Sequence, residues 1–562
     1  MPKMTGARFL AETLSGYGVT HFFFMPVVVP EAMPEMERLG IRRIMTHGEK
    51  AAAYMADAFG RVKGSVGVCG SQSVGALNLA AGLQDAYLAC SPVIALTGRL
   101  AQNQQQRNAY QEVDHHDPFA AVTKYNVAVN NVDEFPLFLR QAFREATTGT
   151  PRPTHLDLSG IAGGIVASGE SDLEVIVEEP FTHVPAFRPE ADTGSIHAAI
   201  QILAQAERPV IVAGGGVTIS GGGAELVALA ERLNVPVATS LNAKHTFPHD
   251  HPLAVGVPGS YSRACANQTL AEADVVFFIG SHTGGQVTND WRLPRPGARI
   301  LQLDIDAAEL GRSFPITVGL QGDAKATMRK MTDAVAGAVA TEPTAARLTW
   351  LQRVQQLVSD WRASVAPLTT SEEVPMRPEQ LCKQLTDLLP EDAILVSDTG
   401  HSGIWTGTMI DLISPNQRYI RCAGSLGWGL PAAIGAKAAA PNRPVVCFTG
   451  DGGIWYHLTE LDTALRYGIN TVTIVNNNAS LNQEQALNER VYGGREPGSD
   501  ELWMLTNADF AAIAESMGCL GIRVDRPAEM SGALEQALAA DRPALIDVKT
   551  NIEGIAPRPW NG

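Results

Sequence analysis

Three features are scarce or missing in this 562-residue sequence, and each absence excludes a class of protein. The seven cysteines are scattered and form no CxxC pair, which is typical of reduced thiols in a cytoplasmic protein. No run of Lys or Arg offsets the net charge of −16, so we expect no binding to nucleic acid. The sequence has no apolar stretch of about 18 residues and no basic segment leading into an apolar one at its start, so we expect neither a membrane span nor a signal peptide.

Apolar runs typical of buried strands alternate with helical patterns along most of the chain. Most of these runs end in Gly, Asp, Ser or Asn, which are common where strands lead into ligand-facing loops. Such alternation predicts an α/β fold, with helices packed on parallel sheets. The runs are SVGVCGS, SPVIALTG, RPVIVAGGG, ADVVFFIGS, ARILQLDID, DAILVSDTG, RPVVCFTGDGG, NTVTIVNNN and RPALIDVKT.

Two segments interrupt this alternation. Residues 166–195 are acidic, contain proline and have weak periodicity. Residues 341–376 combine a helical pattern, ARLTWLQRVQQLVSDWRASV, with the polar segment TTSEEVPMRPEQ. Because a chain of this length exceeds what one core supports, we interpret both segments as linkers. The predicted α/β domains are residues 1–165, 190–340 and 375–562.

The strongest motif is the segment TGDGGIWYHLTELDTALRYGINTVTIVNNNAS, which begins at Thr449. A buried strand brings Asp451 to a glycine-rich turn, an amphipathic helix follows, and a second strand ends at Asn477 and Asn478. This βαβ pattern predicts that Asp451 and Asn478 lie close together at neighbouring strand ends. Glycines in the turn let the backbone approach an anion near a helix N-terminus. They are Gly450, Gly452 and Gly453.

A carboxylate, an amide oxygen and a backbone carbonyl are hard ligands that, with two diphosphate oxygens and water, complete octahedral Mg²⁺. An ordinary βαβ crossover with a glycine turn is the alternative. The order GDG, helix, strand and NN resembles the thiamine-diphosphate enzymes, a family that includes acetolactate synthase, pyruvate decarboxylase, benzoylformate decarboxylase and oxalyl-CoA decarboxylase. The resemblance implies thiamine diphosphate and Mg²⁺ as cofactors, with Asp451, Asn478 and the Ser480 carbonyl as metal ligands.

The rest of the chain carries the same resemblance, nearest to the acetolactate synthase-like branch. It implies three doubly wound parallel-sheet domains of the α/β class: pyrimidine-binding, central and diphosphate-binding. The segment THGEKAAAYMADAFGRVKG resembles the family helix that opens with a glutamate, here Glu49. That carboxylate would bond the pyrimidine ring and stabilise the imino tautomer, whose nitrogen takes the proton from the thiazolium carbon. Taken alone, Glu49 is better explained as a glutamate that the dipole favours at a helix N-terminus, and only its place in this ordered set of motifs favours the catalytic interpretation.

The segment QRNAYQEVDHHDPFAAVTKYN is similar to acetolactate synthase and oxalyl-CoA decarboxylase. The similarity places Tyr110 and Gln111 where those enzymes have an aromatic residue and a Gln or Glu facing the active site. His115 and His116 do not fall on the paired histidines of pyruvate decarboxylase. We therefore interpret these two histidines as surface or interface residues.

In the third predicted domain, DTGHSGIWT fits a strand end and helix start that hold the diphosphate. Its candidate contacts are Thr399, Gly400, His401 and Ser402. GSLGWGLPAAIGAK places Leu426 where the family has a large apolar residue under the bent cofactor. In this family each site lies between the first domain of one chain and the third domain of its neighbour. The resemblance therefore implies a homodimer or homotetramer.

Several features depart from the family pattern. Val27, Val28 and Val29 replace the usual small residues, and they either narrow the substrate site or fill the core. Glu484 has the offset from Asn478 of a proton-handling glutamate in pyruvate decarboxylases, or it is a solvated residue of a mobile loop. Gln483 and Gln485 are its neighbours. The segment GSHTGGQVTNDW stands where flavin-binding acetolactate synthases have an Arg-Phe-Asp-Asp type of turn, so we expect no bound flavin. The short tail, DVKTNIEGIAPRPWNG, offers little chain to cover an acyl-CoA.

These features predict a thiamine-diphosphate-dependent carbon–carbon lyase or carboligase that acts on 2-oxo acids. Decarboxylation would be followed by protonation or by transfer to an acceptor carbonyl, with Glu49, Tyr110, Gln111 and Glu484 as catalytic candidates. The alternative enzyme is a 2-hydroxyacyl-CoA or 2-hydroxyketone lyase, which Tyr110–Gln111 favours and the short tail disfavours. The remaining hypotheses are a non-catalytic scaffold that kept the fold and an oxidase that passes electrons to a flavin.

Overall fold

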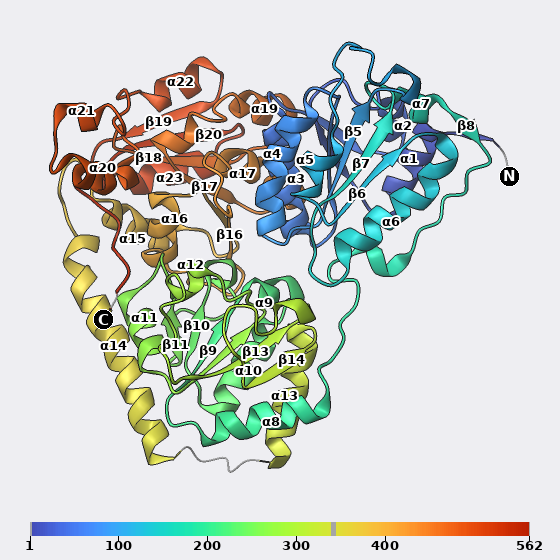
Figure 1. Cartoon of the computed structure of the whole chain (residues 1–562). Helices are drawn as coiled ribbons and strands as arrows, with labels where there is room; N and C mark the ends of the chain where they lie inside the picture. The colour runs from blue at the N-terminus through green and yellow to red at the C-terminus, as the bar shows by residue number, and fades with distance from the viewer. Residues whose placement is uncertain (1–2, 339–343, 561) are drawn as a thin grey trace.

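The computed structural model describes residues 3–338, 344–560 and 562. These residues form three six-stranded sheets, in the blue to cyan, green to yellow and orange to red parts of Figure 1. All strand pairs within the three sheets are parallel. The predicted fold class, three doubly wound parallel-sheet domains, is confirmed.

The first sheet is built from residues before the first predicted linker. In spatial order its strands are β3 (Arg42–Met45), β2 (His21–Phe24), β4 (Gly67–Ser71), β5 (Val93–Arg99), β7 (Thr154–Ser159) and β6 (Tyr125–Val129). Its helices are α1 (Gly6–Gly16), α2 (Ala32–Arg38), α3 (Glu49–Lys63), α4 (Ala76–Leu88), α5 (His116–Ala120), α6 (Phe135–Thr147) and α7 (Gly164–Ser168). A separate antiparallel pair joins β1 (Met4–Thr5) to β8 (Glu170–Ser171).

The middle sheet has a different strand order. Its strands are β11 (Ala254–Gly256), β10 (Val237–Thr239), β9 (Pro209–Ala213), β12 (Val275–Ile279), β13 (Arg299–Asp304) and β14 (Val318–Gln321). Its helices are α8 (Thr193–Gln205), α9 (Gly215–Ser220), α10 (Gly223–Leu233), α11 (Ala264–Glu272), α12 (Gly285–Thr288) and α13 (Ala324–Ala338). The long helix α14 (Ala345–Thr369) then leads to the third domain along one side of the molecule (Figure 1).

The third sheet carries the GDG and NN motifs. Its strands are β16 (Arg418–Arg421), β15 (Ile394–Ser397), β17 (Val445–Gly450), β18 (Val472–Asn477), β20 (Ala544–Lys549) and β19 (Leu520–Val524). Its helices are α15 (Pro378–Leu388), α16 (His401–Thr408), α17 (Gly429–Ala439), α18 (Asp451–Ile454), α19 (Glu460–Tyr467), α20 (Gln485–Tyr492), α21 (Pro497–Asp500), α22 (Phe510–Ser516) and α23 (Met530–Leu538).

The first and third sheets share one topology. Numbered from the first main strand of each domain, both have the order 2-1-3-4-6-5, whereas the middle sheet has 3-2-1-4-5-6. In such open sheets, ligands bind beyond the carboxyl ends of the strands. The carboxyl ends of β15, β17 and β18 are therefore the first place to look for a site.

The nine apolar runs identified in the sequence all form strands, namely β4, β5, β9, β12, β13, β15, β17, β18 and β20. The helix expected after the GDG turn is interrupted, because α18 ends at Ile454 and α19 begins only at Glu460. We propose 1–165, 190–340 and 375–562 as the domain boundaries, since each range encloses one sheet. Residues 1–2 and 339–343 at these boundaries lie outside the described residues.

The first and third domains of the chain pack closely through α3 and α17. A Cβ on Gly435 would lie 2.1 Å from the Met55 carbonyl oxygen, so only glycine allows this approach. The buried Asp57 carboxylate accepts hydrogen bonds from Arg61 Nη2 at 2.7 Å and from Trp428 Nε1 at 3.0 Å. The two domains therefore form a continuous core rather than a loose contact.

The chain ends against the middle domain. Asn267 Nδ2 donates to the Trp560 carbonyl at 3.3 Å, and the Arg295 guanidinium lies over the Trp560 ring at 5.6 Å. Figure 1 shows the C-terminus beside α11 and α14. Within the described part of the chain, no helix is long and apolar enough to cross a membrane.

Candidate active site

Three polar residues follow neighbouring strands of the third sheet. Asp398 follows β15, Asp451 follows β17, and Asn478 follows β18. Because β15 pairs with β17 and β17 pairs with β18, all three side chains lie at one edge of the sheet. Ser480 completes the group, two residues after Asn478.

The three predicted metal ligands are joined by direct contacts. The Ser480 backbone N–H donates to Asp451 Oδ2 at 2.9 Å, and the Ser480 hydroxyl donates to Asn478 Oδ1 at 2.7 Å. Burial raises the pKa of the Asp451 carboxyl to about 6, although backbone N–H groups that donate to it oppose that shift. Among the described residues, no Lys, Arg or His forms an ion pair with Asp451.

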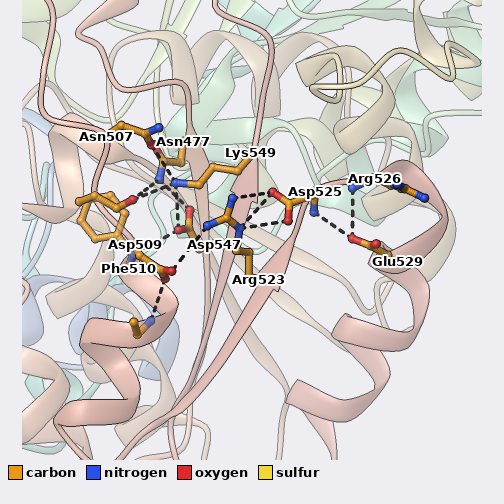
Figure 2. A network of polar contacts seen from close by, with 12 residues as sticks. Asn477, Asn507, Asp509, Phe510, Arg523, Asp525, Arg526, Glu529, Asp547 and Lys549 are labelled. Carbon is orange, nitrogen blue, oxygen red and sulfur yellow. Dashed lines mark hydrogen bonds and ion pairs between the residues drawn. The ribbon is translucent and has the colours of Figure 1, made fainter.

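The strand that delivers Asn478 is anchored by its neighbour, Asn477 (Figure 2). Asn477 Nδ2 donates to Asp547 Oδ1 at 2.8 Å and to the Ala508 carbonyl at 3.1 Å. The Lys549 ammonium lies 3.2 Å from the other Asp547 oxygen, Oδ2. Phe510, at the start of α22, donates its backbone N–H to the same oxygen at 3.1 Å. A network centred on the buried Asp547 carboxylate therefore fixes the end of β18, from which residues 478–480 continue.

The glycines of the GDG turn serve internal packing. A Cβ on Gly452 would lie 2.3 Å from Leu481 Cδ2, and one on Gly453 would lie 2.6 Å from Thr449 Oγ1. A Cβ on Gly450 would make only an ordinary contact with Ser402 Oγ at 3.5 Å. The turn thus brings β17, α16 and the segment after Asn478 into contact around Asp451.

The predicted diphosphate residues form the start of α16. Gly400 has a φ of +65°, which favours glycine, and a Cβ there would lie 3.0 Å from Gln483 Oε1. His401 Nδ1 is buried and has no hydrogen-bond partner among the described residues, and burial lowers the pKa of His401 to about 4. Thr399 is half-buried and Ser402 is buried. The turn therefore presents a helix N-terminus and the unpaired His401 nitrogen, and Ser402 of the same turn lies beside Gly450.

Asp398 organises the backbone behind this turn. Its carboxylate accepts hydrogen bonds from the N–H groups of Thr399, Gly427 and Gly429 and from the Thr449 hydroxyl, at 2.8–3.1 Å. Burial raises its pKa to about 6. In the first domain, Asp85 accepts the N–H groups of residues 423–425. These contacts hold the loop on both sides of the half-buried Leu426.

Glu49 is the first residue of α3, as the sequence predicted. Asn78 Nδ2 donates to Glu49 Oε2 at 3.2 Å. A Cβ on Gly75 would lie 2.4 Å from Glu49 Oε1, so the carboxylate rests against the bare backbone of this glycine. The hydrogen-bond partner of Glu49 thus belongs to its own domain.

Gln111 contacts the same segment, residues 71–78, through Ser73. The Ser73 hydroxyl donates to the Gln111 carbonyl at 2.7 Å, while Gln111 Oε1 is buried without a partner among the described residues. Tyr110 points outward and is 80% exposed. Residues 71–78 therefore hydrogen-bond two predicted catalytic residues of this domain, Glu49 through its carboxylate and Gln111 through its backbone.

One prediction for this segment is wrong. His115 is buried within its own domain, with Nδ1 3.2 Å from Asp157 Oδ1, and is not a surface or interface residue. His116 is exposed, as predicted. The difference arises because β5 and β7 bring Asp157 under the start of α5, a juxtaposition that local sequence does not reveal.

The structure also shows where two further departures from the family pattern lie, the three valines and Glu484. Val28 and Val29 are fully buried in the core of the first domain, whereas Val27 is 45% exposed. Core filling therefore accounts for two of the three valines. Glu484 is exposed in the loop after the metal segment. Its neighbour Gln483, not Glu484, reaches the Gly400 turn.

Sequence reasoning missed the supporting residues. Asp398 had a usable signal, since it is the polar residue that ends a buried strand just before the diphosphate turn. Asn477 had one as the first member of the NN pair. Ser73, Gly75 and Asp157 had none, because their importance depends on neighbours far away in the chain.

The residues present fit thiamine diphosphate and Mg²⁺. A buried carboxylate without an ion-pair partner suits a divalent cation, and the amide and carbonyl oxygens beside it are the ligands Mg²⁺ accepts. The unpaired His401 nitrogen at a helix N-terminus suits a diphosphate oxygen. The described residues contain no cluster of three or more His, Cys, Asp or Glu side chains that could hold a metal ion.

Comparison with known proteins extends the resemblance over the chain. Family models of thiamine pyrophosphate enzymes match the N-terminal TPP binding domain at residues 4–117, the central domain at 196–331 and the C-terminal TPP binding domain at 398–548.

Curated relatives agree with these matches. A probable acetolactate synthase large subunit of Methanocaldococcus jannaschii is 35% identical, over 97% of this chain and 92% of the relative. The acetolactate synthase isozyme 3 large subunit of Escherichia coli is 30% identical, over 99% of this chain and 96% of the relative. With its motifs in place in both outer domains, the chain belongs to the thiamine pyrophosphate enzymes and is a thiamine-diphosphate-dependent enzyme similar to acetolactate synthase large subunits.

Proposed function

We propose that this enzyme decarboxylates a 2-oxo acid and then protonates the product or transfers the acyl unit to an acceptor aldehyde or ketone. The observation that carries the proposal is that one short segment, residues 71–78, hydrogen-bonds both Glu49 and Gln111. The same segment thereby holds a carboxylate for the pyrimidine ring and the backbone of a residue whose side-chain amide would bind the reacting carbonyl. The names of the relatives, acetolactate synthase large subunits, support the same chemistry.

Each residue has a defined task in this proposal. When bound, thiamine diphosphate supplies the nucleophilic carbon and the electron sink for loss of CO₂. Asp451, Asn478 and the Ser480 carbonyl hold Mg²⁺, and the start of α16 holds the diphosphate. Leu426 supports the cofactor from below.

The first domain and the segment of the third domain that carries Glu484 would handle protons and substrate. Glu49 holds a proton at the pyrimidine ring, and the Gln111 amide orients the substrate carbonyl. Tyr110 and Glu484, which are exposed in the single chain, would contribute only where a second chain or the substrate covers them. Glu484 would then hold or release a proton at the product.

We propose that two chains share each site, in a homodimer or a homotetramer. Glu49 is bonded within its own domain, and Val74 and Leu77 beside it are 50% and 40% exposed. A second copy would cover this apolar rim and supply the metal-holding residues. We also propose a cytoplasmic location, since all seven cysteines are unpaired.

The function is tested by measuring CO₂ release from a panel of 2-oxo acids, with thiamine diphosphate and Mg²⁺ present. Glu49→Gln is the negative control and Glu37→Gln, at a side chain 72% exposed, is the matched control. Release that requires Glu49 is the expected result. If no acid releases CO₂, the proposal fails, and aldehyde formation from 2-hydroxyacyl-CoA or 2-hydroxyketones becomes the next assay.

Sharing of the site is tested by co-expressing Glu49→Gln with Asp451→Ala. In a shared arrangement each mixed dimer contains one intact site, so about a quarter of the activity returns on random pairing. Sites confined to one chain would give no recovery at all.

A further inference from the structure

The loop that carries Gln111 has an unusual backbone. Gln106, Asn108 and Gln111 have φ values of +59°, +55° and +61°, a region that residues other than glycine seldom occupy. Glu112 closes the loop, because its carboxylate accepts the backbone N–H groups of Gln106 and Ala109. Such strain persists only where the surroundings fix the backbone.

The fixed points come from behind the loop. The Ser73 hydroxyl, on a fully buried side chain, donates to the Gln111 carbonyl at 2.7 Å. His115, four residues further along, also has a fully buried side chain. Its Nε2 lies 3.5 Å from Ser73 Oγ, at the outer limit of hydrogen bonding, and its Nδ1 lies 3.2 Å from Asp157 Oδ1.

The last residue in this series of contacts, Asp157, belongs to the first sheet. Asp157 lies on β7, and the Thr97 hydroxyl on the adjacent strand β5 donates to its Oδ1 at 2.8 Å. Burial by itself would raise the pKa of Asp157, but the His115 hydrogen bond and the nearby imidazoles outweigh burial and hold that pKa below its ordinary value. An ionised carboxylate, rooted in two strands, thus holds His115 at the start of α5.

We propose that Ser73, His115 and Asp157 are positioning residues that fix Gln111 toward the reacting carbonyl. The inference rests on the proposed role of Gln111. It explains two buried polar groups, the Ser73 hydroxyl and the His115 ring. The Gln111 side-chain amide, whose oxygen has no partner among the described residues, stays available, and its N–H group would donate to the reacting carbonyl. None of the three positioning residues reaches the reacting atoms, because all are buried behind the loop.

A double-mutant cycle tests whether Ser73 acts through Gln111. Ser73→Ala should lower kcat/KM for the preferred 2-oxo acid about tenfold, since small misplacements of a catalytic group are costly. In the Gln111→Ala background the same change should cost less than about twofold, because non-additivity marks residues that act as a unit. Equal losses in both backgrounds would overturn the proposal. Thiamine diphosphate binding should be unchanged in all three variants.

Hydrogen exchange tests the same idea without activity. His115→Gln and Ser73→Ala should each increase exchange in residues 105–115, whereas His116→Gln, at the exposed neighbour, should not. Unchanged exchange in the first two variants would refute the positioning role. Absence of CO₂ release by the unaltered enzyme would instead count against the proposed function, so the two failures are distinguishable.

Discussion

The first and third domains have the same strand order but present different chemistry at the same edge. In the third domain, the residues that we assign to the cofactor site and its support follow the strands directly, as Asp398, Asp451 and Asn478 do. In the first domain, Glu49 begins a helix and Gln111 comes from a loop between β5 and α5. The third domain therefore suits fixed ligands for metal and diphosphate, and the first suits side chains that handle protons and substrate.

Each of the two sheets has a buried aspartate at the same position of the corresponding strand. Asp157 is the fourth residue of β7, Asp547 is the fourth residue of β20, and both strands occupy the fifth place in their sheets. Each buried aspartate pins a functional segment: Asp157 holds His115 below the Gln111 loop, and Asp547 holds Asn477 before the metal segment (Figure 2). The comparison teaches that the shared sheet topology holds the loops in place, while the residues at the strand ends and in those loops decide the chemistry.

The substitution Glu49→Gln should distinguish the role of the first domain from that of the third most clearly. We expect turnover to fall by about 100- to 10,000-fold, the range of general acid–base catalysis, with cofactor affinity nearly unchanged. Steady-state CO₂ release and titration with thiamine diphosphate measure both quantities. A parallel loss of cofactor binding would show that the first domain also anchors the cofactor and would break the division of labour.

Asp451→Ala should have the opposite effect. Loss of the only carboxylate among the proposed ligands should weaken Mg²⁺-dependent cofactor binding at least about 100-fold, more than loss of an outer partner does. Fluorescence titration of thiamine diphosphate at fixed Mg²⁺ checks this. Asp250→Ala, at a side chain 79% exposed, is the control. Unchanged affinity would remove Asp451 from the metal site.

Asp547→Asn tests the rear support of the third domain. It keeps the size of the side chain but removes the charge that faces Lys549, so we expect about tenfold weaker Mg²⁺-dependent cofactor binding. Turnover at saturating cofactor should change little. Asp525→Asn alters the exposed end of the network in Figure 2 and should have no effect. Equal effects of both changes would refute the supporting role.

The substitution Asp398→Asn has the smallest expected effect, a change in how the stability of the protein depends on pH. Its folded pKa of about 6 exceeds the ordinary value of 3.8, so its contribution is fully present below about pH 4 and is lost as pH rises through about 6. The melting temperature of the unaltered protein, relative to Asp398→Asn, should therefore fall by a few degrees between those pH values. Scanning calorimetry of both proteins without cofactor checks the sign. A difference independent of pH would contradict the raised pKa.

Much of the fold was predictable because its signals are local. Nine buried strands were identified from short apolar runs, and the motif from Thr449 to Ser480 predicted the contact between Asp451 and the metal segment. That contact follows from sequence because β17 and β18 are consecutive in the chain and adjacent in the sheet. The short helix α18 and the break before α19 were not predicted, since an apolar pattern alone does not show where a helix is interrupted.

The sequence by itself determined the α/β class and the three sheets, and it gave the candidate residues for the cofactor site. Tertiary structure decided what holds them: His115 lies over Asp157, Gly75 makes room for Glu49, and the Asp57 carboxylate joins α3 to Trp428. These pairs are 26 to 371 positions apart in the chain. Their partners are set by which strands and helices become neighbours, and burial then makes each unpaired polar group costly enough to require one.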